Sequence, residues 1–270
     1  MTELKEESIF FNNRPSSKGN QLKWNNEGFW YKADYSGYEG LAEYMVSGLL
    51  KHSSLSENEF VPYELEQIKY KKQTFNGCKS QDFANGKQLI TAERLIKATS
   101  GISLHDSVYS IRNVEERLKF AVEILEKATG LKDVGPHLAK AVTIDAVFLN
   151  EDRHWHNIAF LMDDNGSYQL CPFFDHGAAL LSDTTMDYPL SENWESLIPE
   201  VRPRTFSLNF EEQLDAVEKL FGRTITFSYS HEDAVRLLES ATCYDTAIKD
   251  RVLAITDESR RKYQYLFKQN

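Results

Sequence analysis

The sequence has no dense run of basic residues and carries more acidic than basic side chains. Lysine and arginine together number 31, against 41 aspartate and glutamate residues, which gives a net charge of −10. Proteins that bind nucleic acid without sequence preference neutralise phosphates with clustered lysine and arginine side chains. We therefore expect no general nucleic-acid binding.

Long hydrophobic runs and cysteine pairs are also missing. No window approaches the roughly 20 apolar residues of a membrane-spanning helix, and the N-terminal MTELKEES has no basic segment followed by an apolar one. The three cysteines, Cys78, Cys171 and Cys243, stand far apart without a CxxC pair, so neither a disulfide framework nor a paired-cysteine zinc site is indicated. We expect a cytoplasmic protein with reduced thiols and no membrane span.

What is present is an ordinary globular composition. Hydrophobic residues make up 41% of the chain and charged residues 27%, which excludes a collagen, a coiled coil and a disordered tail. At about 150 residues per domain, the 270 residues suggest one large domain or two lobes. Such a chain is long enough to bury a substantial core.

The first part of the chain, to about residue 90, is predicted to consist mostly of β-strands. Short apolar runs separated by polar turn residues are typical of antiparallel hairpins. The predicted strands are Ser8–Phe11, Gln21–Trp24, Phe29–Asp34, Phe60–Tyr63 and Glu66–Phe75. One helix is predicted over Gly40–Leu50, where apolar residues recur at helical spacing. The polar stretch Asn76–Lys87 is predicted to be a connector.

The rest of the chain is predicted to be mainly helical. The candidate helices are Thr91–Thr99, Val114–Thr129, Pro136–Leu149, Phe210–Leu220, His231–Glu239 and Asp245–Phe267. One hairpin interrupts them, formed by Asn157–Met162 and Ser167–Asp175 around a strong turn signal. The segment Gly177–Ser207 has little periodicity, and a loop of that length inside a compact domain is usually functional.

A polar cluster, NEDRHWHN over residues 150–157, follows an apolar helix and precedes the hairpin. Because the helix is buried, the cluster must emerge at a loop that the core supports. Asp152 and Asn157 lie on this loop, and the hairpin is expected to bring Asp175 back near Asn157. Three hard oxygen groups at one point are typical of a site for magnesium together with phosphate oxygens. One carboxylate can receive a hydroxyl proton while the other groups hold the metal.

These residues carry a resemblance to a known family. The run DRHWHN, followed by FFDHG, resembles the catalytic loop and metal-binding motif of HipA-type serine/threonine kinases, which are related to phosphoinositide 3-kinases. The resemblance covers most of the chain and is strongest at residues 150–177. It implies an α+β, two-lobed, protein-kinase-like fold. A small antiparallel-sheet N-lobe with one helix would occupy residues 1–85, and a larger, mainly helical C-lobe residues 86–270.

The same resemblance implies an ATP- and Mg²⁺-dependent phosphotransferase, a protein serine/threonine kinase that transfers the γ-phosphate to a hydroxyl. Asp152 would be the catalytic carboxylate, with His154 beside it to meet the phosphate or assist proton transfer. Asn157 and Asp175 would bind magnesium. Arg153 would position the loop.

ATP contacts are implied for the first part of the chain. Lys32, at the end of the run FWYK, resembles the lysine that contacts ATP phosphates. Glu43 is the better candidate for the helix carboxylate near Lys32, although Glu39 lies one turn earlier. The run SSKGNQLK resembles a phosphate loop, whose implied ATP-binding residues are Ser16, Ser17, Lys18 and Gly19. In HipA-type kinases a serine of this loop can be autophosphorylated, and Ser16 matches best.

The sequence departs from other kinases in two places. It has no GxGxxG motif, and it reads Asp175-His176-Gly177, with His176 in the place of the usual phenylalanine. A protein substrate and an antitoxin-like or regulatory partner are implied. Three alternatives stay open: a lipid or small-molecule kinase of the same fold, a nucleotide-binding pseudokinase, and a transition-metal hydrolase. The last would use Asp152, His154, His156 and Asp175 as ligands.

Overall fold

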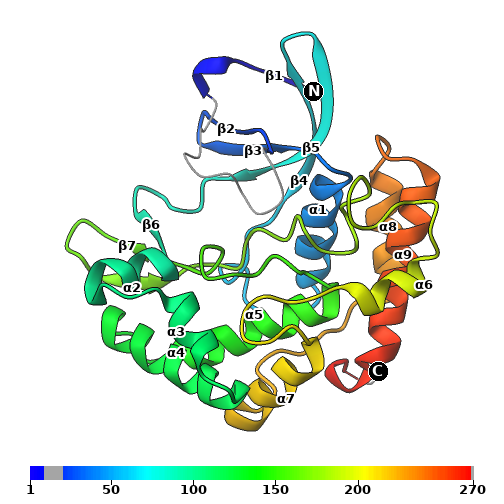
Figure 1. Ribbon diagram of the computed structural model, residues 1–270. Helices are drawn as coiled ribbons and strands as arrows, with labels where there is room; N and C mark the ends of the chain where they lie inside the picture. The colour runs from blue at the N-terminus through cyan, green and yellow to red at the C-terminus, as the bar shows by residue number, and fades with distance from the viewer. Residues whose placement is uncertain (9–20, 269–270) are drawn as a thin grey trace. The chain divides into compact units, whose positions relative to one another are not determined.

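The computed structural model describes residues 1–8 and 21–268 (Figure 1). The proposed phosphate-loop residues Ser16, Ser17, Lys18 and Gly19 lie outside the described residues, as does the predicted strand Ser8–Phe11 beyond its first residue. The chain divides into two compact units. Unit 1 comprises Met1–Phe83, Asp175–Val201 and Phe227–Asn270, and unit 2 comprises Ala84–Phe174 and Arg202–Thr226.

Unit 1 contains a five-stranded sheet with the strand order β1-β4-β5-β3-β2. Its strands are β1 (Thr2–Leu4), β2 (Lys23–Asn26), β3 (Phe29–Ala33), β4 (Glu64–Tyr70) and β5 (Gln73–Gln81). Neighbouring strands are antiparallel, except that β1 runs parallel to β4. The sheet has its own buried hydrophobic cluster, formed by Leu4, Trp24, Tyr31, Ala33 and Ile68.

Two strand predictions in this region were wrong. Phe60–Tyr63 is not a strand, because Pro62 has no N–H to donate and the Tyr63 N–H bonds to Ser47 Oγ on a helix instead, at 3.1 Å. Glu66–Phe75 is two strands joined by a tight turn in which Lys71 takes a φ of 55°. The second of them, β5, runs on to Gln81 through the first half of the predicted connector.

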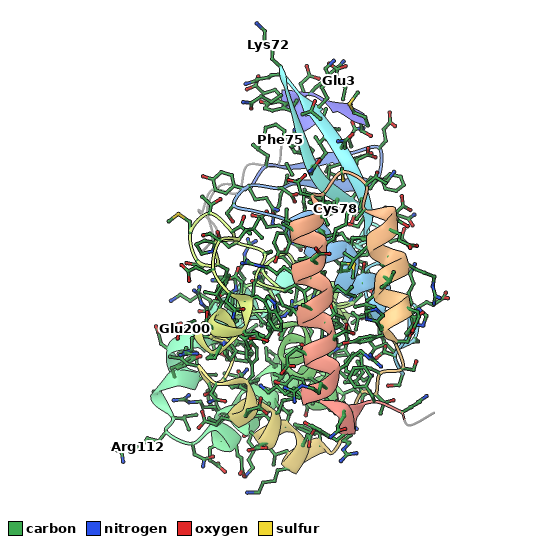
Figure 2. The ribbon with its side chains drawn as sticks, turned by 90° about the vertical axis from the view of Figure 1, so that its right-hand side faces the viewer. Glu3, Lys72, Phe75, Cys78, Arg112 and Glu200 are labelled. Carbon is green, nitrogen blue, oxygen red and sulfur yellow. The ribbon has the colours of Figure 1, made fainter. Side chains whose placement is uncertain are left out.

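The helices of unit 1 are α1 (Glu39–Leu50), α6 (Trp194–Leu197), α8 (His231–Ser240) and α9 (Thr246–Lys262). α1 is buried over most of its surface because β3, β4 and β5 pack against it and α8 covers it as well. α8 and α9 lie side by side, as both views show (Figures 1 and 2). The helix predicted over Gly40–Leu50 is therefore confirmed as an internal helix of this unit.

The segment after Asp175 is ordered by a buried arginine. Arg251 of α9 is 5% exposed and donates hydrogen bonds to the carbonyl oxygens of Tyr188, Pro189 and Glu192, at 2.7, 2.6 and 3.2 Å. Three carbonyls held by one guanidinium fix the path of an otherwise irregular chain. The predicted loop from Gly177 onward thus has a defined conformation.

Unit 2 combines five helices with a small sheet. The helices are α2 (Ala92–Ser100), α3 (Leu104–Ser110), α4 (Val114–Thr129), α5 (Val134–Phe148) and α7 (Phe210–Phe221). The sheet has the order β6-β7-β8, formed by β6 (Gln88–Thr91), β7 (Ala159–Met162) and β8 (Tyr168–Leu170). The predicted hairpin is confirmed as β7 and β8. The short elements α3 and β6 were not predicted.

The most apolar helix of unit 2 is α5, which packs against both α4 and α7. It is the helix that leads into the polar cluster at residues 150–157, and its end is buried, with Phe148 0% and Leu149 4% exposed. The cluster therefore starts from the core, as predicted. Within the residues that the structure describes, no helix is long and apolar enough to cross a membrane.

Candidate functional site

Lys32 makes a buried ion pair in unit 1. Side chains alternate along β3, so Tyr31 and Ala33 join the hydrophobic cluster of the sheet while Lys32 points to the opposite face. Its Nζ lies 2.5 Å from Glu43 Oε1 and 2.7 Å from Asp175 Oδ1. Lys32 is 8% exposed and Glu43 1% exposed, so this contact is shielded from water.

The charges around Lys32 favour its protonated form. Burial alone would lower the pKa of Lys32, but the carboxylates of Asp175 and Glu43 raise that pKa well above its ordinary value. Tyr63 completes the surroundings, with its hydroxyl 3.5 Å and its ring centroid 5.2 Å from Nζ. The lysine thus has a permanent positive charge held between two carboxylates.

Glu43 is the carboxylate that pairs with Lys32. Its second oxygen accepts a hydrogen bond from the His176 backbone N–H at 2.7 Å, which fixes the side chain at both ends. Glu39 has a different task, because its carboxylate accepts the backbone N–H groups of Tyr35, Ser36 and Gly37. Glu39 caps the turn that starts α1.

One glycine allows α1 to lie close to β5, and a second allows β5 to lie close to β3. A Cβ on Gly40 would lie 2.5 Å from the carbonyl carbon of Gly77, and a Cβ on Gly77 would lie 2.1 Å from the carbonyl oxygen of Lys32. Asp34 adds a tether, since its Oδ1 accepts the Gly40 N–H at 2.6 Å. The first turn of α1 is therefore seated directly on β5.

Asp175 has an unusual backbone conformation. Its φ is 62°, in the left-handed region that aspartate tolerates better than most residues. Such conformations persist where the surroundings enforce them, and they cluster at functional sites. The Asp175 side chain is 23% exposed, so a ligand can reach its carboxylate.

In unit 2 the loop at residues 150–157 is built around Arg153. The Arg153 side chain is 3% exposed and forms an ion pair with Asp145 of α5 at 3.1 Å. It also donates to the carbonyl oxygens of Asn157, at 3.1 Å, and Phe174, at 2.7 Å. Burial raises the pKa of Asp145, and the Arg153 guanidinium opposes that rise.

Arg153 in this way joins the loop to the residue before Asp175. The Asp152 side chain is 15% exposed, with Oδ1 at 3.9 Å from His154 Nε2 and at 3.7 Å from Arg204 Nη1. The Asn157 side chain donates from Nδ2 to the Asp152 carbonyl oxygen at 2.9 Å. This bond fixes the amide and leaves Asn157 Oδ1 to act as an acceptor or ligand.

The two residues predicted to bind magnesium carry suitable donor atoms. The Asn157 amide oxygen and the Asp175 carboxylate are hard oxygen groups, the type that Mg²⁺ prefers, and Mg²⁺ sites in proteins use one or two carboxylates plus phosphate oxygens. Over residues 1–8 and 21–268, no group of three or more His, Cys, Asp or Glu side chains is arranged to hold a metal ion. The transition-metal alternative therefore has no ligand cluster in that part of the chain.

The predicted site residues fall into two groups. Lys32, Glu43 and Asp175 meet in unit 1, and Asp152 lies close to His154 and Asn157 in unit 2. The convergence of Asn157 with Asp175, and the role of each residue, stay predictions.

Sequence reasoning missed Asp145, Tyr63 and Arg204. Only Asp145 had a usable signal, because one acid within the apolar run LAKAVTIDAVFL needs a buried partner. Tyr63 and Arg204 are distant in sequence from the residues that they approach. No local pattern in the sequence marks them.

No family model matches the chain, and no curated protein resembles its sequence. Among solved structures, it is similar to the proinflammatory kinase CtkA of Helicobacter pylori, with a TM-score of 0.62 and 15% identity over 97% of this chain and 94% of that one. HipA of Shewanella oneidensis MR-1, in a toxin–antitoxin complex with HipB and operator DNA, gives a TM-score of 0.45 and 12% identity over 94% and 62%. The likeness to CtkA confirms the predicted α+β, protein-kinase-like fold.

Proposed function

We propose that this protein is an ATP- and magnesium-dependent phosphotransferase, a HipA-like protein serine/threonine kinase. The observation that carries the proposal is the buried ion pair between Lys32 of β3 and Glu43 of α1. Protein kinases use a strand lysine and a helix glutamate in this way to hold ATP phosphates. Because of the cost of removing both charges from water, a buried ion pair often contributes little to net stability, which favours a functional reason for this one.

Lys32 and Asp175 would change partners when the nucleotide binds. A phosphate oxygen would take the place of Asp175 beside the Lys32 ammonium, while Glu43 keeps the lysine in position. The Asp175 carboxylate would then be released to bind magnesium together with Asn157 Oδ1. Magnesium, when bound, would neutralise the charge of the phosphates.

Asp152 would receive the hydroxyl proton of the acceptor. Its backbone is held at both ends, because its N–H donates to Asn150 Oδ1 at 3.3 Å and its carbonyl oxygen accepts the Asn157 amide at 2.9 Å. Phosphoryl transfer asks for little covalent chemistry from the protein, so positioning and charge neutralisation would supply most of the rate. A fixed carboxylate suits that task.

Labelled ATP tests the proposal directly. Asp152→Ala and Asp175→Ala are each expected to abolish magnesium-dependent transfer to protein acceptors in a host lysate and to the kinase itself. Asp164→Ala, which removes an exposed carboxylate in the β7–β8 turn, is the matched control and should keep full transfer. Unchanged transfer in either site variant would contradict the assignment.

Thermal unfolding separates this proposal from the alternatives. A ligand that binds the folded state raises the unfolding temperature by mass action. Stabilisation by Mg-ATP without any transfer would identify a pseudokinase, and transfer only to lipids or small molecules would identify the other kinase class.

Mass spectrometry of the phosphorylated protein would show whether Ser16 is modified. A protein acceptor, an antitoxin-like or regulatory partner and a cytoplasmic location belong to the same proposal.

A further inference from the structure

Unit 2 contains a cavity of about 610 Å³ beside the predicted catalytic carboxylate. Its walls come from four segments: α2, α3, the loop at residues 150–157 and the beginning of the segment Arg202–Thr226. The side chains that matter here are His105, Tyr109, His154, His156 and Arg204. Cavities of about 300–1,000 Å³ are typical of ligand sites, so this one can receive side chains of a polypeptide.

The wall formed by α3 is aromatic and firmly supported. His105 and Tyr109 are one helical turn apart, and their ring centroids are separated by 4.8 Å. Arg117 lies over the ring of Tyr109, with its guanidinium carbon 4.8 Å from the ring centroid, and donates to the carbonyl oxygen of Phe206 at 2.7 Å. Trp155, 1% exposed, closes the cavity from the loop side.

The polar groups of the cavity favour an anion. Arg204 is always protonated and offers a planar set of donors that fits a carboxylate or a phosphate. Its side chain is 44% exposed and therefore open to a ligand. Imidazoles carry at least one ring N–H donor in either protonation state, which adds His105 and His156 to the donors. The protein as a whole has a net charge of −10, so this gathering of cationic and donor groups is local.

One acidic residue, Glu93, also lines the cavity. Its Oε2 accepts the backbone N–H of His105 at 2.9 Å, at the start of α3. One oxygen of the Glu93 carboxylate therefore already accepts a hydrogen bond from the protein backbone. Arg204 itself lies beside a different carboxylate, that of Asp152, at 3.7 Å.

Arg204 and His154 link the cavity to Asp152. Arg204 Nη1 lies 3.7 Å and His154 Nε2 lies 3.9 Å from Asp152 Oδ1. A polypeptide in extended conformation advances about 3.3 Å per residue. A group bound by Arg204 would therefore belong to a residue close in sequence to the one at Asp152.

We propose that this cavity binds an anionic side chain of the acceptor polypeptide, within about two residues of the serine or threonine whose hydroxyl proton Asp152 receives. The inference rests on the proposed kinase function and adds to it a substrate class, acceptors with an acidic residue or a phosphoserine beside the modified serine or threonine. Both anions offer oxygen atoms to the same guanidinium. The cavity thus determines specificity rather than chemistry.

Binding and transfer can be measured separately. Fluorescent peptides with alanine in place of the acceptor serine report binding alone, by anisotropy. Each peptide has Glu, Gln, Lys or phosphoserine at one of the four positions within two residues of the central alanine. At low salt, the wild-type protein is expected to bind the best Glu or phosphoserine peptide about tenfold more tightly than its Lys counterpart. The tighter of the two anionic peptides identifies carboxylate or phosphate as the preferred group.

Arg204→Glu is expected to reverse this preference, so that the Lys peptide binds more tightly. Arg204→Gln is the second variant, expected to remove the preference, in case the charge reversal prevents folding. Arg112→Glu makes the same charge change at an exposed residue of unit 2, labelled in Figure 2, and should keep the wild-type preference. Thermal unfolding of all variants checks that they are folded.

Equal binding of Glu, phosphoserine and Lys peptides by the wild type would overturn the proposal, as would a preference that survives both Arg204 substitutions. Failure of the kinase function gives a different result. In that case the wild type transfers no labelled phosphate to the matching serine peptides. The binding preference of the alanine peptides and its dependence on Arg204 are still measured, so the two failures cannot be confused.

Discussion

At the scale of single residues, one buried ion pair sets the shape of the loop that carries Asp152. Arg153 is held by Asp145 and holds the carbonyl oxygens of Asn157 and Phe174. Arg153→Met should therefore lower the free energy of unfolding by about 3–5 kcal/mol, because it leaves the Asp145 carboxylate buried without a partner. Urea unfolding measures this loss.

The double variant Asp145→Asn/Arg153→Met provides the control. It removes the unpaired charge as well, so it should be more stable than Arg153→Met alone, even though Asn157 still loses a donor to its carbonyl. Transfer of labelled phosphate should stay low in both variants because the loop is no longer held. An Arg153→Met protein as stable as the wild type would contradict this account.

Asp34 gives the protein a predictable pH dependence. Burial raises the pKa of its carboxyl to about 7, opposed by hydrogen bonds from the Gly40 N–H and the Tyr244 hydroxyl. The ordinary pKa of an unfolded aspartate is about 3.9. The native state therefore keeps a proton that the unfolded chain releases. The stabilising contribution of this proton is complete below about pH 4 and is lost as the pH rises to about 7.

Asp34→Asn removes this titration while retaining an acceptor for Gly40 and a polar group for Tyr244. Unfolding by urea at pH 5 and at pH 8 should show the variant gaining stability relative to the wild type at the higher pH. About two pH units separate pH 5 from the Asp34 pKa of about 7, which sets an upper bound of about 3 kcal/mol on that relative gain. The prediction fails if the two proteins differ by the same amount at both pH values.

At the scale of elements, the first turn of α1 determines where Glu43 lies. Alanine favours helix over glycine by about 1 kcal/mol, yet Gly40→Ala should destabilise the protein by about 1–3 kcal/mol, because the new Cβ would overlap the Gly77 backbone. Displacing α1 should also weaken the pair of Lys32 with Glu43 and reduce phosphate transfer. Urea unfolding and the labelled-ATP assay measure the two effects.

Gly48→Ala, in the same helix, is the matched control. Its Cβ would meet only the flexible end of the Leu237 side chain, at 2.8 Å, which can move aside. We expect this variant to keep wild-type stability and transfer. Equal effects of the two substitutions would show that the close seating of α1 on β5 is unimportant.

Periodicity and local motifs predicted much of the structure but not its long-range contacts. α1 was predicted to within one residue of its start, and α4 with its observed ends, because apolar spacing and caps are local. The β4–β5 turn was missed because Lys71 and Lys72 are not turn-forming residues. The choice between Glu43 and Glu39 depends on how α1 packs against β3, which no local pattern encodes.

At the scale of the whole molecule, the chain passes from one compact unit to the other four times, since unit 1 is formed from three separate segments. Its sheet comes from the first segment, but α1 is covered by α8, and Phe227 forms a bridge with Ser53 just after α1. The last segment also supplies Arg251, which holds the carbonyl oxygens of Tyr188, Pro189 and Glu192. The sheet should therefore depend on residues at the opposite end of the chain.

Truncation after Thr226 tests this dependence, because it removes the last segment of unit 1 and keeps every residue of unit 2. Hydrogen exchange should become fast in β3, β5 and α1, whose buried surface is exposed, while α4, α5 and α7 keep their protection. Arg251→Met in the full chain is the milder counterpart and should speed exchange mainly around residues 188–192. Full protection of β3 and β5 in the truncated protein would mean that the first segment folds without the last.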